Sequence, residues 1–173
     1  MPFRRIWLVL IFCVSLAAVS CQKENHSENI PEGTNPSGNP SGTVNETVLL
    51  QLVNNVRQTG CTCGSTVMPP VAAITWNDQL ATAAFNHSND MSANNYFNHI
   101  GLSGSTAGDR IAAAGYAWKA YGENIAKGYS NEQTVIDGWL KSEGHCKNIM
   151  SPLFREMGVA RVGGYWTQEF ASR

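Results

Sequence analysis

The stretch MGVARVGGYWTQEFA, residues 157–171, decides the fold class, because here the chain changes from helical spacing to β-rich sequence. Its two halves contain many β-branched and aromatic residues, and Gly163 and Gly164 separate them. A two-residue glycine turn suits a type I′ hairpin, which needs positive φ at both central positions. Because an isolated hairpin is marginally stable, a further strand is expected, and either residues 122–127 or residues 71–76 could supply it.

Four segments upstream of the hairpin have the apolar spacing or the capping residues of helices. Residues 45–58 place their valines and leucines on one face, which predicts the first helix. Three more helices are predicted at residues 75–94, 106–114 and 130–141, each introduced by a capping box. The boxes pair Thr75 with Asp78, Thr106 with Asp109, and Ser130 with Gln133. Four helices and a hairpin predict an α+β domain.

The composition is that of an ordinary globular protein with room for one domain, which we place at residues 44–173. Of the 173 residues, 43% are hydrophobic and 14% are charged. The net charge of −1 comes from 12 Lys and Arg against 13 Asp and Glu, with no basic block that would neutralise phosphates. Nucleic acid is therefore not expected as a partner.

Residues 1–20 have the pattern of a secretory signal peptide. Arg4 and Arg5 precede an apolar run at residues 6–19, which is followed by Ser20 and Cys21. The run is shorter than the roughly 20 residues that a helix needs to cross a hydrocarbon core, so no permanent transmembrane span is predicted. The segment is expected to be removed during export.

The residues before Cys21 resemble a lipobox, the site where bacterial lipoproteins are cleaved and acylated on the new N-terminal cysteine. Ala18 stands where Leu is commoner, so simple secretion with cleavage near Ser20 is the alternative. Residues 21–43 include NPSGNPSG and almost no large apolar side chain, which predicts a lipidated N-terminus and a disordered linker. The expected location is the outer membrane or cell surface, with the lipid as membrane anchor.

A series of short motifs in the globular part resembles the bacterial branch of the CAP superfamily, also called the SCP or cysteine-rich secretory protein domain. The motifs, in order, are PPVAAITWNDQLATAAFNHSNDM, YFNH, DRIAAAGY, YGENIA, GWLKSEGHCKNIM, FREMGVA and YWTQEFA. With the first helix they cover residues 49–171. The resemblance implies a three-layer α/β/α sandwich with a central antiparallel sheet, and a cleft where two histidines and acidic residues meet.

The cleft residues that the resemblance implies are His99 in YFNH, Glu123 in YGENIA and His145 in SEGH. A fourth member is open, because Ser142 stands where animal members have a glutamate and Glu143 comes next. Either Glu143 substitutes from the neighbouring position, or the site has three members. Two imidazoles with one or two carboxylates can bind a divalent metal, above all Zn²⁺, or act as general acid and base.

A purely structural interpretation of the same residues is the alternative. The two cleft histidines could satisfy buried backbone groups, Glu123 could cap a turn, and Glu143 could be a solvated loop charge. His87 lies among apolar positions of the second helix and is interpreted as a packing histidine.

Five cysteines are present, but Cys13 leaves with the signal peptide and Cys21 would carry lipid. The remaining three, Cys61, Cys63 and Cys146, allow one disulfide and one leftover thiol in an oxidising compartment. The resemblance implies the pair Cys63 and Cys146, with Cys61 to Cys146 as the alternative. A bridge that closes a loop of about 80 residues contributes roughly 4 kcal/mol in the chain-entropy model.

Three functions follow from this interpretation. The first is a binding module that holds a divalent metal and an extracellular lipid, peptide or envelope component. The second is a metal-assisted hydrolase acting on peptide or cell-wall material, since no GxSxG nucleophile motif is present. The third is a scaffold in which the cleft residues only maintain structure.

Overall fold

The computed structural model describes residues 44–173. The predicted signal peptide at residues 1–20, the lipidation site Cys21 and the linker to residue 43 lie outside the described residues. No helix among residues 44–173 has the length and apolar character that a bilayer crossing requires.

The main sheet has four strands in the order β3, β5, β6, β4. The predicted hairpin forms β5 (Glu156–Val162) and β6 (Tyr165–Ser172), which pair antiparallel. Both candidates for a further strand join it: β4 (Ala120–Lys127) pairs antiparallel with β6, and β3 (Thr75–Trp76) pairs parallel with β5. A separate hairpin of β1 (Cys61–Cys63) and β2 (Thr66–Met68) was not predicted.

The turn of the main hairpin has the backbone that its glycines predict. Gly163 has φ 56° and Gly164 has φ 93°, so both central residues are in the left-handed region that a type I′ turn needs. A two-residue loop of this kind matches the twist of the flanking strands, which fixes the register of β5 against β6.

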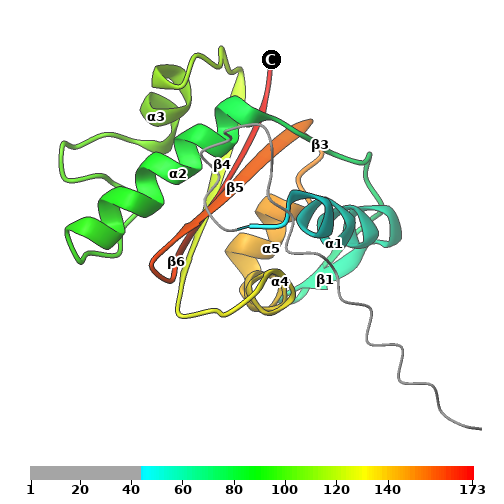
Figure 1. The fold of residues 1–173 in the computed structure, drawn as a ribbon. Coiled ribbons are helices and arrows are strands. Elements are labelled where there is room, and N and C mark those ends of the chain that lie inside the picture. Colours follow the sequence, from blue (N-terminus) through cyan, green and yellow to red (C-terminus); the bar gives the residue numbers. More distant parts are fainter. Residues whose placement is uncertain (1–43) are drawn as a thin grey trace, which may run out of the picture. The chain divides into compact units, whose positions relative to one another are not determined.

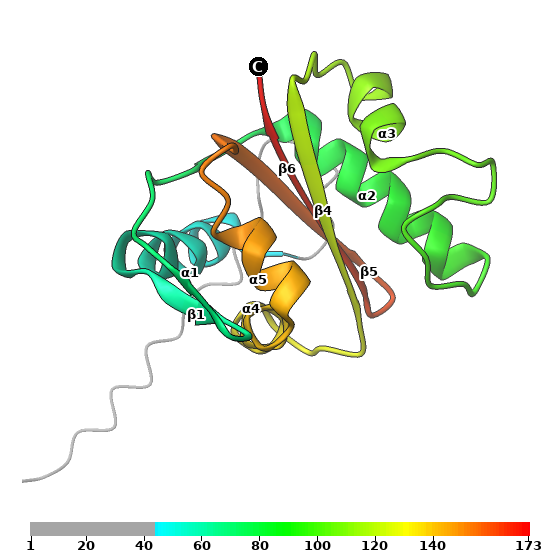
Figure 2. The ribbon, with the colours of Figure 1, turned by 180° about the vertical axis from the view of Figure 1, so that it is seen from behind.

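Helices cover both faces of the main sheet and make a three-layer sandwich (Figures 1 and 2). On one face lie α2 (Asp78–Ala93) and α3 (Ala107–Ala113). On the other lie α1 (Glu46–Thr59), α4 (Glu132–Lys141) and α5 (Glu143–Ile149). The α+β sandwich is as expected, with one parallel pairing added to the antiparallel sheet, while α5 was not predicted.

The predicted start of α2 is wrong. Thr75 lies in β3, where its amide donates to the carbonyl of Arg155 at 3.0 Å, so it cannot cap the helix. Asn77 is the cap, with an extended backbone and a side-chain oxygen that accepts from the amides of Gln79 and Leu80. An asparagine at this position satisfies two of the amides that a helix N-terminus leaves free.

Of the other two predicted capping boxes, one is confirmed and one is wrong. Thr106 and Asp109 form the predicted reciprocal box at the start of α3. At α4 the box is formed by Asn131 with Thr134, one residue later than the predicted Ser130. The predicted end of α4 at Lys141 is confirmed.

The central strand β6 is buried on both faces, because helices pack on each side of it. Trp139, Trp166 and Phe170 are among the largest side chains on the α1, α4 and α5 side. On the α2 side, Gly158 of β5 lies so close to the helix that a Cβ there would collide with the backbone of Ala81. Glycine therefore sets the short distance between α2 and the sheet.

The edge strand β4 is covered by side chains from α4 and α5. The indole of Trp139 donates to the carbonyl of Ile125 at 3.2 Å, and the amide of Asn148 donates to the carbonyl of Glu123 at 3.0 Å. These bonds fix both helices against the outer edge of β4. The α2–α3 loop reaches the same edge from the opposite face, so the two helical layers meet there.

Candidate functional site

Glu123, on β4, is the centre of the candidate site. Its side chain is 4% exposed, and its two oxygens are bonded to different partners: Oε1 lies 2.6 Å from Nδ1 of His99 and Oε2 lies 2.5 Å from a guanidinium nitrogen of Arg110. Burial alone would raise the pKa of Glu123, but the bond from His99 and the charge of Arg110 outweigh it and lower the pKa. Glu123 is therefore ionised at neutral pH.

The ring of His99 faces solvent from the loop between α2 and α3, with 52% of the side chain exposed. An ionised carboxylate accepts hydrogen bonds only, so Nδ1 of His99 is the donor, and in the neutral imidazole Nε2 has the lone pair. Arg110 also donates to the carbonyl of His99 at 3.0 Å, and His87 Nε2 lies 2.9 Å from the carbonyl of Asn98. The buried side chains of Arg110 and His87 thus fix the loop that presents His99.

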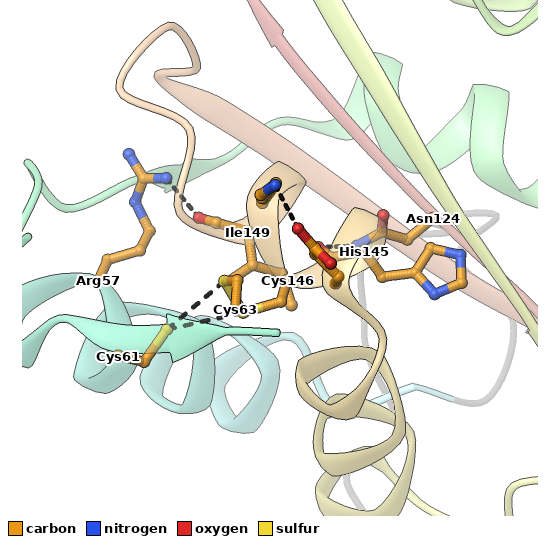
Figure 3. The surroundings of a disulfide bond; sticks show 9 residues. Arg57, Cys61, Cys63, Asn124, His145, Cys146 and Ile149 are labelled. Atoms are coloured by element: carbon orange, nitrogen blue, oxygen red, sulfur yellow. Dashed lines mark hydrogen bonds and ion pairs between the residues drawn. A yellow bond between two sulfur atoms is a disulfide. The ribbon is translucent and has the colours of Figure 1, made fainter. Parts of the chain in front are cut away.

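His145 approaches from the other layer, in the first turn of α5. Burial, followed by the positive charge that His99 can carry, lowers the pKa of His145, so the two imidazoles are close enough to repel each other when protonated. Its ring makes no hydrogen bond to another residue of the described chain. Figure 3 shows the ring pointing away from the neighbouring sulfur atoms.

A network of buried amides holds α5 against β4. Asn124 donates to Gln168 at 3.0 Å and to the carbonyl of His145 at 3.2 Å, and Asn148 donates to Asn124 at 2.9 Å. Asn148 also bonds the backbone of Glu123. The two faces of the site are therefore connected through one polar cluster, which fixes the position of His145 relative to the carboxylate.

The disulfide beside His145 joins Cys63 to Cys146, as the resemblance implied, with their Cα atoms 5.5 Å apart. Cys61 is left as a free thiol. The bridge attaches the β1–β2 hairpin to α5 (Figure 3). It therefore restrains the residue that follows His145.

Glu143 does not lie with the other three predicted residues. It is the first residue of α5 rather than a loop residue, its side chain is 51% exposed, and its Oε1 lies 2.6 Å from the ammonium of Lys147. Two residues along a helix correspond to a rotation of about 200°, so Glu143 and His145 point to opposite sides of α5. Glu143 is a surface ion-pair residue, and the cleft has no second glutamate from this helix.

A second buried carboxyl, Glu169 on β6, was missed in the sequence. It lies directly opposite Glu123 in the strand register and is fully buried. Burial, together with the charge of Glu123, raises its pKa well above the ordinary value. Neither oxygen of Glu169 accepts a hydrogen bond from a donor in residues 44–173. Glu169 therefore bonds to Glu123 by donating the proton of its own neutral acid form.

Two other members of the site were also missed. Arg110 stands inside the DRIAAAGY motif, where a charge between apolar helix residues was a sign of burial with a partner. His87 was interpreted as a packing residue, yet its Nε2 lies 3.9 Å from Glu123. Similarly, Glu169 interrupts the aromatic strand YWTQEFA, which was a visible signal for a buried acid.

The metal ligands that the site offers are the imidazoles of His99 and His145 rather than the carboxylate of Glu123. Both oxygens of Glu123 are already bonded, so Glu123 orients His99 in the way that carboxylates support metal-binding histidines. Within residues 44–173, the ligand atoms of His99, Glu123 and His145 do not all lie within 4.8 Å of one another. His99 and His145 would then be the protein ligands, with the remaining positions open to solvent or a bound molecule.

A pocket of ≈ 260 Å³ lies next to His145, at the edge of β4. Its wall is mostly apolar and comes from the α2–α3 loop, β4, α4 and α5. The lining residues are Phe97, Ile125, Ala126, Lys127, Tyr129, Gly138, Trp139, Ser142 and His145. This volume is slightly below the roughly 300 Å³ at which sites for drug-sized ligands begin, so it suits a single side chain or a short acyl segment.

Known proteins share this fold and these motifs. Residues 50–170 match the model of the cysteine-rich secretory protein family, CAP. The uncharacterized membrane protein YlbC of Bacillus subtilis (strain 168) is 34% identical over 131 residues, which are 76% of this chain and 35% of that protein. The chain thus spans about a third of that relative's length.

Solved structures agree with the family match. An extracellular protein containing an SCP domain from Bacillus anthracis str. Ames is 30% identical with a TM-score of 0.61, over 74% of this chain and 41% of that one. An outer surface protein from Borrelia burgdorferi, at 18% identity, shares the fold with a TM-score of 0.63 over 73% of this chain and 91% of that one. Because the family model covers most of the described residues, the chain belongs to the cysteine-rich secretory protein (CAP) family.

Proposed function

We propose that the chain is an exported binding protein whose cleft at the edge of β4 holds a divalent metal, with zinc as the leading candidate. The proposal rests on the hydrogen bond of 2.6 Å between Nδ1 of His99 and Glu123, because this bond leaves Nε2 of His99 free toward solvent. The lowered pKa of His145 keeps a second imidazole neutral at pH 7, which is the form that binds metals. A bound zinc ion would supply a Lewis-acid centre beside the apolar pocket.

Titration of the purified full-length chain with Zn²⁺ in a calorimeter tests the proposal. His99→Ala and His145→Ala are each expected to weaken binding at least about tenfold, because each removes one ligand. Glu123→Gln is expected to weaken it about 10- to 100-fold, because the support of His99 is lost while both imidazoles remain.

Glu143→Gln is the matched control for these variants, since it neutralises a nearby carboxylate outside the cleft. It is expected to bind Zn²⁺ like the unchanged chain. Circular dichroism establishes that each variant is folded. If the unchanged chain binds no more Zn²⁺ than the His99→Ala, His145→Ala double variant, the metal proposal is wrong and the scaffold interpretation stands.

The pocket beside His145 supports a ligand, an extracellular lipid, peptide or envelope component, that places an apolar group next to a polar one. Trp139 forms part of the wall, so its fluorescence can report binding. Dodecanoate and a short hydrophobic peptide are suitable probes. Phe97→Ala removes an exposed part of the wall and is expected to reduce the response to whichever probe binds.

A hydrolase is the second candidate, and the His99–Glu123 pair favours it. A carboxylate that holds one imidazole nitrogen leaves the other as a general base, the role that histidine has in many hydrolases. Turnover of fluorogenic peptides or cell-wall fragments that is lost in Glu123→Gln would support the hydrolase. Absence of turnover in a chain that binds Zn²⁺ would support the binding protein.

Export and lipid anchoring rest on residues 1–21, whose pattern is that of a lipoprotein signal. Relatives that are extracellular, outer surface or membrane proteins agree with export. Expression in bacteria fed alkyne-palmitate is expected to label the chain, and Cys21→Ala is expected to abolish both the label and membrane association. Cys13→Ala, which changes a residue of the removed segment, is the control. Equal labelling of Cys21→Ala and the unchanged chain would contradict the anchor.

A further inference from the structure

Three sulfur atoms meet where the β1–β2 hairpin contacts α5 (Figure 3). The thiol sulfur of Cys61 lies 3.7 Å from Sγ of Cys146 and 3.8 Å from Sγ of Cys63. Cys63 and Cys146, which form the disulfide, are 0% and 1% exposed, whereas Cys61 is only partly buried. The free thiol therefore lies against a disulfide that is itself shielded from solvent.

Strand geometry explains why Cys61 and Cys63 are equivalent neighbours of Cys146. Residues i and i+2 of a strand point to the same face, so both side chains of β1 are directed toward α5. The nearly equal distances from Cys61 to the two bonded sulfurs place its thiol beside the disulfide bond rather than along its line, so β1 has to move before the thiol can attack. The β1–β2 hairpin pairs with no strand of the main sheet, so a local adjustment of β1 leaves that sheet intact.

We propose that this cluster is a thiol–disulfide exchange site, in which a local movement of β1 brings Sγ of Cys61 into line with the disulfide, and its thiolate then attacks Sγ of Cys146 and displaces Cys63. The Cys61–Cys146 bond forms as the Cys63–Cys146 bond breaks, and the departing Cys63 thiolate takes up the proton that Cys61 released. One disulfide is replaced by another, so no oxidant or reductant is consumed. The same step in reverse restores the original bond.

The exchange would change how α5 is attached, because Cys146 directly follows His145. Moving the bond from Cys63 to Cys61 shifts the attachment point by two residues of strand, or about 6.6 Å. Burial raises the pKa of the Cys61 thiol, so the reactive thiolate is scarce at neutral pH. Exchange is accordingly expected on the timescale of seconds to hours that disulfide reshuffling takes. The proposal stands independently of metal binding in the cleft.

Trapping of free thiols in the full-length chain tests the exchange. The chain is purified in detergent without reductant, incubated at mildly alkaline pH, and then unfolded in N-ethylmaleimide at pH 6, where alkylation is faster than exchange. Peptide sequencing by mass spectrometry shows which cysteine carries the label. Label on both Cys61 and Cys63, in a ratio that reaches a plateau with time, supports the proposal. Label confined to Cys61 at all times overturns it.

Two single substitutions form a matched pair. In oxidised glutathione, which accepts the two electrons, Cys63→Ser is expected to form the Cys61–Cys146 bond, which lowers labelling of Cys146 about tenfold relative to the same variant after reduction. Cys61→Ser should keep Cys63 and Cys146 unlabelled. Full labelling of Cys146 in a folded Cys63→Ser chain would contradict the proposal. If that variant does not fold, the label distribution in the unchanged chain decides the question alone.

Discussion

Glu169 is a carboxylic acid that its surroundings keep neutral. It is fully buried, faces the ionised Glu123 across the strand pair, and receives no hydrogen bond from another residue in 44–173. Arg110 lies 4.0 Å away, but its close bond is to Glu123. A charge at Glu169 would therefore lack compensation, so the folded domain holds a proton that the unfolded chain releases at neutral pH.

Glu169→Gln is expected to raise the free energy of unfolding at pH 7. Because the folded pKa of Glu169 is raised, its contribution to stability is complete below the ordinary value of 4.5 and is lost as the pH rises through the folded pKa. Glutamine keeps an N–H donor toward Glu123 but does not titrate. The free energy of unfolding at pH 7 is therefore expected to rise by about 1.4 kcal/mol for each unit by which the pKa of Glu169 is raised. Urea denaturation at pH 4 and pH 7 measures it. An equal effect at both pH values would show that protonation is not the cause.

The contributions of His87 and His145 to stability have the opposite pH dependence to that of Glu169, because burial lowers the pKa of both histidines. A histidine with a lowered folded pKa is protonated first in the unfolded chain, so its contribution to stability is constant above the ordinary value of 6.5 and declines below it. The decline approaches about 1.4 kcal/mol per pH unit for each histidine between its two pKa values. Urea denaturation from pH 7.5 to 5.5 measures it, and His145→Asn should show a shallower slope.

The sequence motifs identified His99, Glu123 and His145, but their functions depend on contacts that no local pattern contains. Glu123 orients His99 because one of its oxygens bonds His99 while the other is bonded by Arg110. Whether Glu143 belongs to the cleft stayed open in the sequence because the direction of a helical side chain depends on where the helix begins, and α5 has no recognisable start signal. Strand register, which places Glu169 opposite Glu123, was equally inaccessible without the fold.

At the scale of elements, the attachment of α1 to the end of α5 depends on one buried guanidinium. Arg57 of α1 has no exposed surface and donates to the carbonyls of Ile149 at 2.6 Å, Ala72 at 2.9 Å and Ser151 at 3.0 Å. Carbonyls at the end of a helix lack partners within it, so Arg57 satisfies groups that would otherwise be buried unbonded.

Arg57→Met is expected to lower the free energy of unfolding by about 2 to 4 kcal/mol, because several buried carbonyls lose their donor while the apolar volume is retained. Arg161→Met is the control, since Arg161 also donates to a backbone carbonyl, that of Ser130, but at an exposed position. Arg161→Met should lower the free energy of unfolding by less than about 1 kcal/mol. Chemical denaturation measures both, and similar losses would show that burial of the Arg57 contacts adds little.

The elements found from the sequence are those with a repeated pattern or, like α3, with a recognisable capping box at their start. The hairpin of β5 and β6 was visible from its glycine turn, and α1 from its apolar spacing. β1 and β2 have three residues each and α5 has seven, which is too short for a period to be recognised. These short elements are held by tertiary bonds, above all the disulfide and the contacts of Arg57.

At the scale of the whole molecule, the disulfide connects residues 83 positions apart, so it restrains most of the domain when the chain unfolds. Cys146→Ser is expected to lower the free energy of unfolding by about 4 kcal/mol, the chain-entropy value for a loop of this length. Cys61→Ser, which leaves the bridge in place, should change it by less than about 1 kcal/mol. Thermal and urea denaturation compare the two. A small loss for Cys146→Ser would show that the unfolded chain is already compact without the bond.

The side-chain bonds to the outer edge of β4 affect the tendency of the domain to aggregate when many copies are close together. An open strand edge offers backbone groups to another chain and can start aggregation. Here the carbonyls of Glu123 and Ile125 are already bonded to α5 and α4, while the opposite edge strand, β3, has only two residues. The main sheet of one copy therefore offers little template for strand addition by a neighbouring copy, which disfavours fibrous association through its edges.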